Sequence, residues 1–403
     1  MIIMTRRFRF SSILLLVSCG LAISGHASVL DVDDILDHAV KKVDKAQAAQ
    51  TDIDRMPRNI PETGKGWDPV SHTSWVSGFW PGVLWYIYDY TEDDKWREIA
   101  HQRNLPVARI LTGEKKDHDL GFQFFCSFGN GFRLTGNPQY KAFLFKSADQ
   151  LAAMYNPTVG TILSWPHARD RYKTEHNTII DNLMNLELLF WVARNGGNRD
   201  YYEIALRHAR VTMENQIRPD YTHWHVVAYD MDTGEAVQKV TRQGYSDDSF
   251  WARGQAWGIY GYAMIFRETR EEAFLRTATR MADVFLEGLP EDHVPYWDFD
   301  APDIPDAPRD ASAAAVAASG LLELSELVEE NELSDRYYQA AVEILNSLWE
   351  NYAAPPDSPA ILGHSVGNYP RGKEVDMPII YSDYYFLEAL LRVRGMQRFK
   401  ELH

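Results

Sequence analysis

Cysteine is scarce in this chain, which has only two thiols in 403 residues, Cys19 and Cys126. We expect Cys19 to leave with an N-terminal leader or to carry lipid, so Cys126 is the single thiol of the mature protein. One thiol can form neither a disulfide within the chain nor a thiolate metal site. The adjacent acids Asp247 and Asp248 have no nearby His or spaced third carboxylate, and we read them as a helix cap. We expect no required metal and no cofactor.

Positive charge is also in short supply. The chain has 41 Lys and Arg against 57 Asp and Glu, a formal net charge of −16. Removal of residues 1–27 takes away three arginines and no acid, which brings the net charge to −19. Because no basic surplus replaces the counterions of a phosphate backbone, we expect no nucleic-acid partner.

No apolar run is long enough to cross a membrane. A short apolar run at residues 13–17 follows Arg6, Arg7 and Arg9 and precedes small residues as far as Ala27. This order is typical of a secretory signal peptide, so we expect residues 1–27 to be removed and the protein to be periplasmic or secreted. Cleavage before Cys19 with attachment of a lipid anchor is the alternative.

The chain also lacks a Gly/Ser linker or a charge run that would divide it. We therefore expect residues 28–403 to form a single domain, although this is longer than a typical domain of ~100 to 200 residues. Aromatic residues are abundant, with 12 Trp and 21 Tyr. Such residues pack a core or offer flat faces to sugar rings, and both uses fit here.

Apolar residues recur at helical spacing in many segments, with few strands between them. The turns at residues 90–96, 134–140 and 195–201 each place a polar or Gly break before an aromatic residue, which indicates repeated helical hairpins with an inner and an outer helix. Five hairpins in order, and a sixth formed by the first and last helices, predict an all-α fold, an (α/α)6 six-hairpin barrel. The expected helices are residues 30–49, 77–90, 94–111, 121–134, 138–154, 178–194, 199–217, 250–267, 271–287, 311–329, 334–352 and 381–394.

If all inner helices run the same way, their N-termini meet at one end of the barrel. Polar and aromatic residues precede or open most of these helices, and the partial positive charge of helix N-termini favours an anion such as a uronate carboxylate. Residues 221–249 alternate and then turn, which predicts a small β-hairpin over this end. Residues 298–309 and 353–377 predict further rim loops.

Two acids stand out at this end. Asp119 follows His118 just before an aromatic run, and Asp181 opens the helix at 178. Either one alone is more simply a helix N-cap. Together, with aromatic residues around both, they suggest acid and base chemistry on a sugar.

Four long motifs carry a resemblance to a known family: HDLGFQF at 118–124, IIDNLMNLELL at 179–189, QGYSDDSFWARGQAWGIYGY at 243–262 and IIYSDYYFLEALLR at 379–392. In this order they resemble glycoside hydrolase family 88, the unsaturated glucuronyl hydrolases, over essentially the whole mature chain. The resemblance implies the same barrel. It also implies removal of a 4,5-unsaturated uronic acid from the non-reducing end of oligosaccharides left by a polysaccharide lyase.

The resemblance also implies roles for individual residues. Asp181 matches the acid/base, and Asp119 a partner carboxylate that binds the sugar and, as a like charge, favours a protonated Asp181. Arg253 matches a residue that contacts the uronate, and we expect it to hold the carboxylate bidentately. The other matching positions contact the uronate (His118, Gln243), stack on sugar (Trp75, Phe79, Trp165, Trp257) or lie near the reacting carbons (His225, with His223 as the alternative).

Several functions stay open on sequence alone. An unsaturated rhamnogalacturonyl hydrolase would use the same barrel with another aglycone, and a polysaccharide lyase or a non-catalytic sugar-binding protein would use it differently. Residues 364–370 contain one Ser and no Lys before Lys373, unlike family members that act on sulfated glycosaminoglycans. A preference for 6-sulfated chondroitin products is therefore not expected. Heparin, hyaluronan, gellan and ulvan products stay open, as does a monomer or a homodimer.

Overall fold

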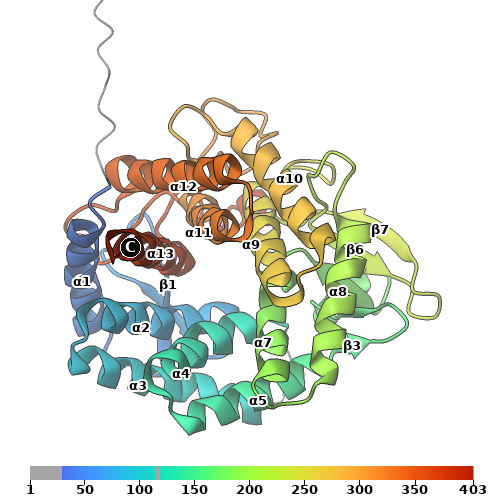
Figure 1. Cartoon of the computed structure of the whole chain (residues 1–403), viewed down its shortest axis with the longest axis horizontal. Helices are drawn as coiled ribbons and strands as arrows, with labels where there is room; N and C mark the ends of the chain where they lie inside the picture. The colour runs from blue at the N-terminus through green and yellow to red at the C-terminus, as the bar shows by residue number, and fades with distance from the viewer. Residues whose placement is uncertain (1–29, 114–117, 403) are drawn as a thin grey trace, which may run out of the picture.

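Six inner helices surround a central axis, and six outer helices surround them (Figure 1). The computed structural model describes residues 30–113 and 118–402, so the expected leader, residues 1–27, lies outside the described part. Each inner helix contacts the next, and the last closes on the first. The inner helices are α2 (Phe79–Thr91), η3 continued by α4 (Gly121–Gly129, Asn130–Thr135), α7 (Asn182–Arg194), α9 (Ala252–Thr269), α11 (Ala311–Leu327) and α13 (Ile380–Leu402).

Each outer helix packs most extensively against one inner helix, as the repeat predicts. The pairing follows the chain in five hairpins, and the first helix covers the last, so the predicted six-hairpin barrel is confirmed. The outer helices are α3 (Asp94–Ala108) on α2, α5 (Pro138–Ala152) on η3, α8 (Asp200–Gln216) on α7, α10 (Glu272–Gly288) on α9, α12 (Asn331–Tyr352) on α11 and α1 (Val32–Ala49) on α13.

Composition separates the two rings. Helix α11 is rich in Ala, and every side chain from Ala311 to Ser325 is buried, because a helix with small and apolar residues all round can pack on every side. Helix α10 buries a single face made of residues such as Phe274, Met281 and Phe285 and leaves its other face to solvent.

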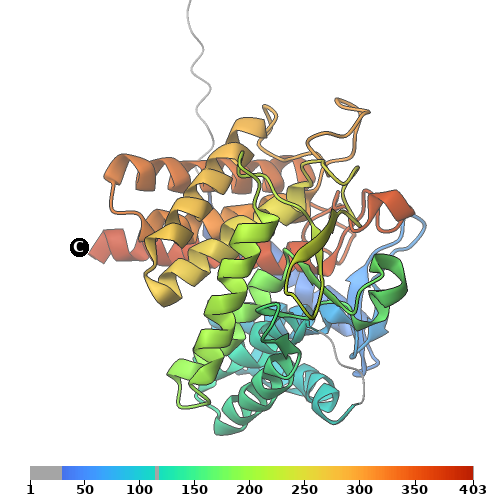
Figure 2. The same cartoon turned by 90° about the vertical axis from the view of Figure 1, so that its right-hand side faces the viewer.

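Short strands and loops gather at one end of the barrel, on the right of Figure 2. The hairpin predicted within residues 221–249 is confirmed as β6 (Val226–Tyr229) and β7 (Ala236–Val240). The sequence did not reveal that β5 (His176–Ile179) joins it as a third antiparallel strand. Two more antiparallel pairs, β1 (Arg55–Asn59) with β2 (Asp68–Ser71) and β3 (Tyr155–Asn156) with β4 (Thr161–Ile162), were also not predicted.

The rim loops come from the predicted regions. Residues 298–309 contain no helix or strand, and residues 353–377 contain only the 3-10 turn η5 (Tyr369–Arg371). Other short helical turns are η1 (Trp75–Gly78), η2 (Arg109–Thr112), η4 (Pro166–Ala168) and α6 (Arg169–Tyr172). Within the described residues, no helix has the length and apolar character needed to span a bilayer.

Candidate active site

Close packing of two inner helices brings the two predicted acids together. Gly121, at the start of η3, lies so near α7 that a Cβ there would be 2.4 Å from the Cα of Asn185. The Phe122 backbone N–H donates to Asn185 Oδ1 at 3.0 Å. Asp119 lies two residues before Gly121, and Asp181 lies about one helical turn before Asn185. The contact therefore puts both carboxylates at the same end of the barrel.

Both acids line one small cavity of about 90 Å³. Six of its seven lining residues are among those predicted from the sequence, and Ile179 is the addition. The cavity is lined by Trp75, Asp119, Trp165, Ile179, Asp181, Gln243 and Arg253.

Asp181 occupies the N-cap position of α7, yet its side chain accepts no capping hydrogen bond. Its Oδ1 has no hydrogen-bond partner among the described residues, and 16% of the side chain is exposed. Burial raises the pKa of Asp181 to about 6, against the opposing positive charges of Arg253 and His118. We expected Asp119 to be the cause of such a shift, and desolvation is the cause instead.

His225 directly precedes strand β6 at the rim and faces Asp181. Its Nδ1 accepts a hydrogen bond from the Arg242 backbone N–H at 3.2 Å, so the neutral ring carries its proton on Nε2. That nitrogen lies 4.0 Å from Asp181 Oδ1 and has no hydrogen-bond partner in the described part of the chain. Burial holds the pKa of His225 well below its usual value. The ring stacks on Trp251 with centroids 4.4 Å apart.

His223, the alternative to His225, belongs to the packing beneath the site. Neither histidine is among the residues that line the cavity, and His223 Nδ1 is 3.0 Å from Gln255 Oε1. A Cβ on Gly254 would lie 2.1 Å from His223 Nε2, so this imidazole is wedged against helix α9. Of the two histidines, His225 is the one that faces the acid.

Asp119 and His118 form a buried pair at the other side of the cavity. His118 Nε2 lies 3.3 Å from Asp119 Oδ1, with side-chain exposures of 1% and 12%. His118 is therefore behind Asp119 and does not line the cavity itself. Its position supports and orients the carboxylate, whereas we expected a direct contact with the uronate.

Trp165 is held at the cavity wall by Asn177 of strand β5. The Trp165 backbone N–H donates to Asn177 Oδ1 at 3.1 Å, and Asn177 Nδ2 donates back to the Trp165 carbonyl at 3.0 Å. The guanidinium of Arg242 lies over the Trp165 ring, 5.2 Å from its centroid. Sequence reasoning missed Asn177, because its role depends on strand β5, which was not predicted and whose last two residues were expected to open a helix.

Two residues expected to stack on sugar lie elsewhere. Phe79 and Trp257 are buried in an aromatic layer beneath the cavity and do not line it. Phe79 packs edge-on against Trp75 with centroids 5.8 Å apart, and Trp257 packs on Phe122 at 5.3 Å. Their place at helical spacing on inner helices explains this correction. They support Trp75, which is half-buried and does line the cavity.

Arg253 is fastened by protein groups. Nη1 donates to Asp310 Oδ2 at 2.9 Å and to the Val366 carbonyl, and Nη2 donates to the Gly367 carbonyl at 2.7 Å and to Gln243 Oε1 at 3.0 Å. All four terminal N–H groups are thereby used. The expected bidentate contact with a carboxylate would require two of these bonds to be exchanged.

The hydrogen bond from Arg253 fixes the orientation of the Gln243 side chain. Because Gln243 Oε1 is the acceptor, its amide Nε2 is the group left to donate into the cavity. The cavity thus holds one buried acid, one second carboxylate, an amide donor and two indole faces. Among residues 30–113 and 118–402, no three His, Cys, Asp or Glu side chains are grouped so that they could hold a metal ion.

Comparisons with known proteins identify the family of this chain. The sequence model of Glycosyl Hydrolase Family 88 matches residues 39–390. An unsaturated glucuronyl hydrolase of Formosa agariphila is 42% identical over 81% of this chain and 82% of its own length. An unsaturated chondroitin disaccharide hydrolase of Streptococcus pneumoniae is 39% identical over 80% of this chain and 82% of its own length.

Solved structures of unsaturated glucuronyl hydrolases are also similar to this chain. An unsaturated glucuronyl hydrolase specific for heparin superposes with a TM-score of 0.86 at 38% identity, over 91% of this chain and 98% of the other. The unsaturated glucuronyl hydrolase of Bacillus sp. GL1 gives a TM-score of 0.86 at 32% identity, over 90% and 97%. The chain belongs to glycoside hydrolase family 88.

Proposed function

We propose that this family 88 glycosidase removes a 4,5-unsaturated uronic acid from the non-reducing end of oligosaccharides produced by a polysaccharide lyase. The observation that carries the proposal is the state of Asp181. It is an acid at a helix N-cap that caps nothing, its pKa is raised to about 6 by burial, and it shares a small cavity with Asp119. Such a carboxyl is still partly protonated near neutral pH and can donate its proton.

The chemistry of the substrate needs one acid/base group. A lyase product carries a C4=C5 double bond next to the ring oxygen and is a vinyl ether. Asp181 gives its proton to C4, and the positive charge that develops at C5 and the ring oxygen is met by water. The ionised Asp181 takes a proton from that water as the C5–O bond forms. The resulting hemiketal opens, and the aglycone leaves with a free hydroxyl.

The other residues in and around the cavity bind and orient the substrate. Asp119, fixed by His118, accepts hydrogen bonds from the sugar hydroxyls, and Gln243 Nε2 donates to the uronate carboxylate. His225 presents Nε2–H to the water or to the charge that develops beside Asp181. Trp75 and Trp165 offer ring faces to the sugar. Arg253 acts through its charge and through its hold on Gln243.

The test is optical, because the conjugated double bond absorbs in the ultraviolet. Mixed with lyase-digested uronan, the protein is expected to remove this absorbance. A rise in absorbance on intact polymer would identify a lyase, and an unchanged spectrum together with measurable binding would identify a sugar-binding protein. Defined disaccharides with and without a rhamnose aglycone distinguish the glucuronyl from the rhamnogalacturonyl reaction.

For the aglycone, we propose a sulfated sugar. The positive charges of Arg371 and Arg171 act on Arg242, whose pKa is lowered first by burial and then by these two neighbours. Arg242 in turn lies over Trp165 at the cavity wall. Arg171 and Arg371 act electrostatically on Arg242, and this gathering of positive charge favours an anionic group. Sulfated heparin- or ulvan-derived products are expected to show a lower KM than neutral gellan-derived ones, and equal KM values would contradict this.

We also propose export, on the leader-like order of residues 1–27 in the sequence. Cell fractionation and the mass of the mature N-terminus test it. A first residue at 28 fits signal peptidase cleavage, and a lipid-modified Cys19 fits the lipoprotein route. Retention of residues 1–27 in the cytoplasm would contradict both.

A further inference from the structure

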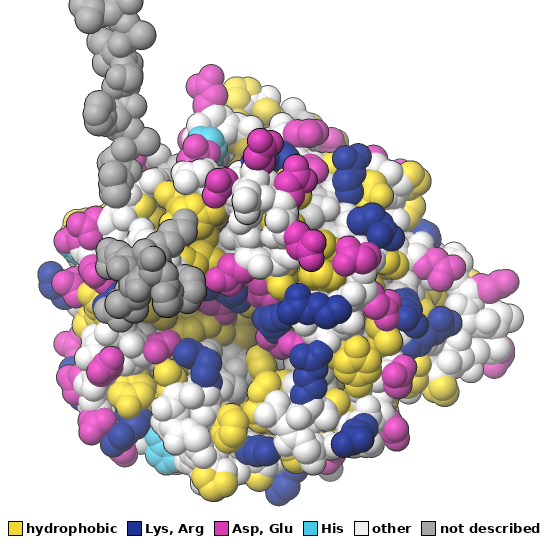
Figure 3. Space-filling model, in the orientation of Figure 1, with side chains coloured by type: hydrophobic (Ala, Val, Ile, Leu, Met, Phe, Trp, Pro, Cys, Tyr) yellow, Lys and Arg dark blue, Asp and Glu magenta, His cyan; other side chains and the backbone are white. Residues whose placement is uncertain are grey.

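A second cavity, of about 510 Å³, lies toward the opposite end of the barrel, where the inner helices end. Figure 3 shows this face, with a central hollow that has hydrophobic side chains in its depth and both acidic and basic side chains around it. Its lining includes Asp89 and Arg133, near the ends of α2 and α4, and Arg392 of α13. No step proposed above uses it.

One aromatic layer separates the two cavities. Phe122 and Tyr385 line the second cavity, and each packs on Trp257, with centroids 5.3 and 5.4 Å away. On the other side, Phe122 packs on Trp75, which lines the catalytic cavity. A ligand in the second cavity is therefore separate from a sugar held by Asp119 and Asp181.

The second cavity lies against a charge network with one negative charge in excess. Glu323 is bound by Arg267 at 2.8 Å and by Arg392 at 3.0 Å. Burial raises the pKa of Glu187 although its partner Arg267 opposes this, and 20% of the Glu187 side chain stays accessible. The network joins four carboxylates (Glu187, Glu268, Glu323, Glu388) with three guanidiniums (Arg194, Arg267, Arg392).

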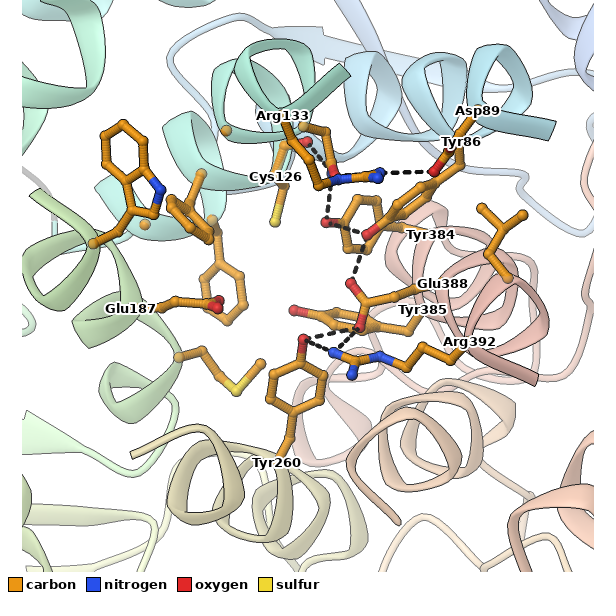
Figure 4. Close-up of a pocket in the computed structure, with 18 of the residues that line it drawn as sticks. Tyr86, Asp89, Cys126, Arg133, Glu187, Tyr260, Tyr384, Tyr385, Glu388 and Arg392 are labelled. Atoms are coloured by element: carbon orange, nitrogen blue, oxygen red, sulfur yellow. Dashed lines mark hydrogen bonds and ion pairs between the residues drawn. The ribbon is translucent and has the colours of Figure 1, made fainter. Parts of the chain in front are cut away.

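A tyrosine hydroxyl points into this space without a partner. Tyr385 is 2% exposed and lines the cavity, and Figure 4 shows no hydrogen bond from its hydroxyl to the other residues drawn. In Figure 4 this hydroxyl and the Glu187 carboxylate both point toward the middle of the cavity. By contrast, Glu388 accepts from the Tyr86 and Tyr260 hydroxyls at 2.6 and 2.9 Å. The walls add the rings of Phe125, Phe132 and Trp191.

We propose that this cavity binds a small organic ammonium ion, with Glu187 as its counter-charge, the Tyr385 hydroxyl as a hydrogen-bond partner and the rings of Phe125 and Trp191 as cation–π faces. A cation next to aromatic faces and a partly desolvated carboxylate is held by both interactions. It also supplies the positive charge that the network lacks. A uronate or sulfated sugar would meet an excess of negative charge here and is disfavoured.

The test is calorimetric titration of the purified protein with choline chloride, matched by its neutral isostere 3,3-dimethylbutan-1-ol. We expect choline to bind at least about tenfold more tightly than the neutral alcohol, because only choline gains the charge interactions. Glu187→Gln is expected to weaken choline binding about tenfold. Glu287→Gln, on the exposed face of α10, is the matched control and should bind as the parent does.

A second variant keeps the test decisive if Glu187→Gln unfolds. Tyr385→Phe removes only a hydroxyl without a protein partner, so the fold should persist while choline binds several-fold more weakly. Equal binding of choline and its isostere, no binding at millimolar choline, or parent-like binding by both variants would overturn the proposal. Asp181→Asn should bind choline normally, so this site and the catalytic one are tested separately.

Discussion

The two ends of the inner barrel differ in how their polar groups are paired. At the N-terminal end, Asp181 Oδ1 and the facing donor His225 Nε2 are 4.0 Å apart, and neither atom has a hydrogen-bond partner within residues 30–113 and 118–402. At the opposite end, Glu388 accepts hydrogen bonds from Tyr86, Tyr260 and Ser319. Unpaired proton donors and acceptors suit proton transfer, whereas a paired network beside aromatic walls suits binding.

The helix direction explains why the chemistry belongs to the first end. The inner helices present their free N–H groups and partial positive charge there, and loops are free to add Trp165, Gln243 and the turn at Val366. At the other end, the last turns carry carbonyls and partial negative charge, which suit cations. The same ring of helices therefore offers an anion site and a cation site at its two mouths.

Replacing the unpaired acid should have the largest effect. Asp181→Asn keeps the shape but cannot donate the proton, so kcat should fall by about 10³-fold or more while oligosaccharide binding persists. Loss of ultraviolet absorbance gives kcat, and calorimetry gives binding. Asp170→Asn, on the short helix α6 outside the cavity, is the control. If Asp181→Asn turned over substrate as the parent protein does, this would contradict the assignment of the reaction to this end of the barrel.

The buried ion pair of the catalytic end should matter next, and for stability. Arg253→Met leaves Asp310 uncompensated and frees the Val366 and Gly367 carbonyls, so the free energy of unfolding should fall by about 3 kcal/mol or more. Urea denaturation measures it.

The control for this pair is the exposed pair Arg97 with Asp94 on α3. Arg97→Met should change the free energy of unfolding by less than about 1 kcal/mol. If Arg253→Met and Arg97→Met lowered the free energy of unfolding by similar amounts, this would show that the pair of Arg253 with Asp310 does not anchor the rim loop.

The sequence was enough for the ring, because helical periodicity is local, and it placed Asp119 and Asp181 at the same end of that ring. It was not enough for the state of Arg253, whose carbonyl partners lie 113 and 114 residues later in a rim loop without regular structure. Periodicity also could not distinguish aromatic residues of a buried layer from aromatic residues that stack on a sugar. Phe79 and Trp257 were therefore assigned to the cavity, although they support it from below.

The start of helix α7 shows a second limit. Residues 178–181 continue its apolar pattern, but Thr178 and Ile179 pair with Val227 and Val226 in a strand. This tertiary pairing outweighs the helical pattern. The helix therefore begins later than the pattern predicts, and Asp181 occupies its N-cap position. The burial of the carboxyl raises its pKa, and its place at the rim depends on a contact with a segment nearly 50 residues away.

The pH dependence should reveal which acid does the chemistry. A general acid works while protonated, so kcat/KM should be level below about pH 6 and fall about tenfold per pH unit above it. His225 stays neutral in this range because burial holds its pKa low. Asp383, whose pKa burial raises to about 7, is the competing explanation. If the fall in kcat/KM shifted to another pH in Asp383→Asn, this would contradict the assignment of the pH dependence to Asp181.

The smallest effect is expected from Gln243, because it binds substrate without taking part in proton transfer. Gln243→Ala removes one amide donor to a charged carboxylate, which should raise KM about tenfold and leave kcat nearly unchanged. Gln238→Ala, exposed on β7, is the control and should change neither constant. Because Arg253 keeps Asp310 and two carbonyls in the Gln243 variant, stability should hardly change. A loss of stability as large as that of Arg253→Met would mean that Gln243 is part of the scaffold, and the catalytic end would then lack a free donor for the uronate.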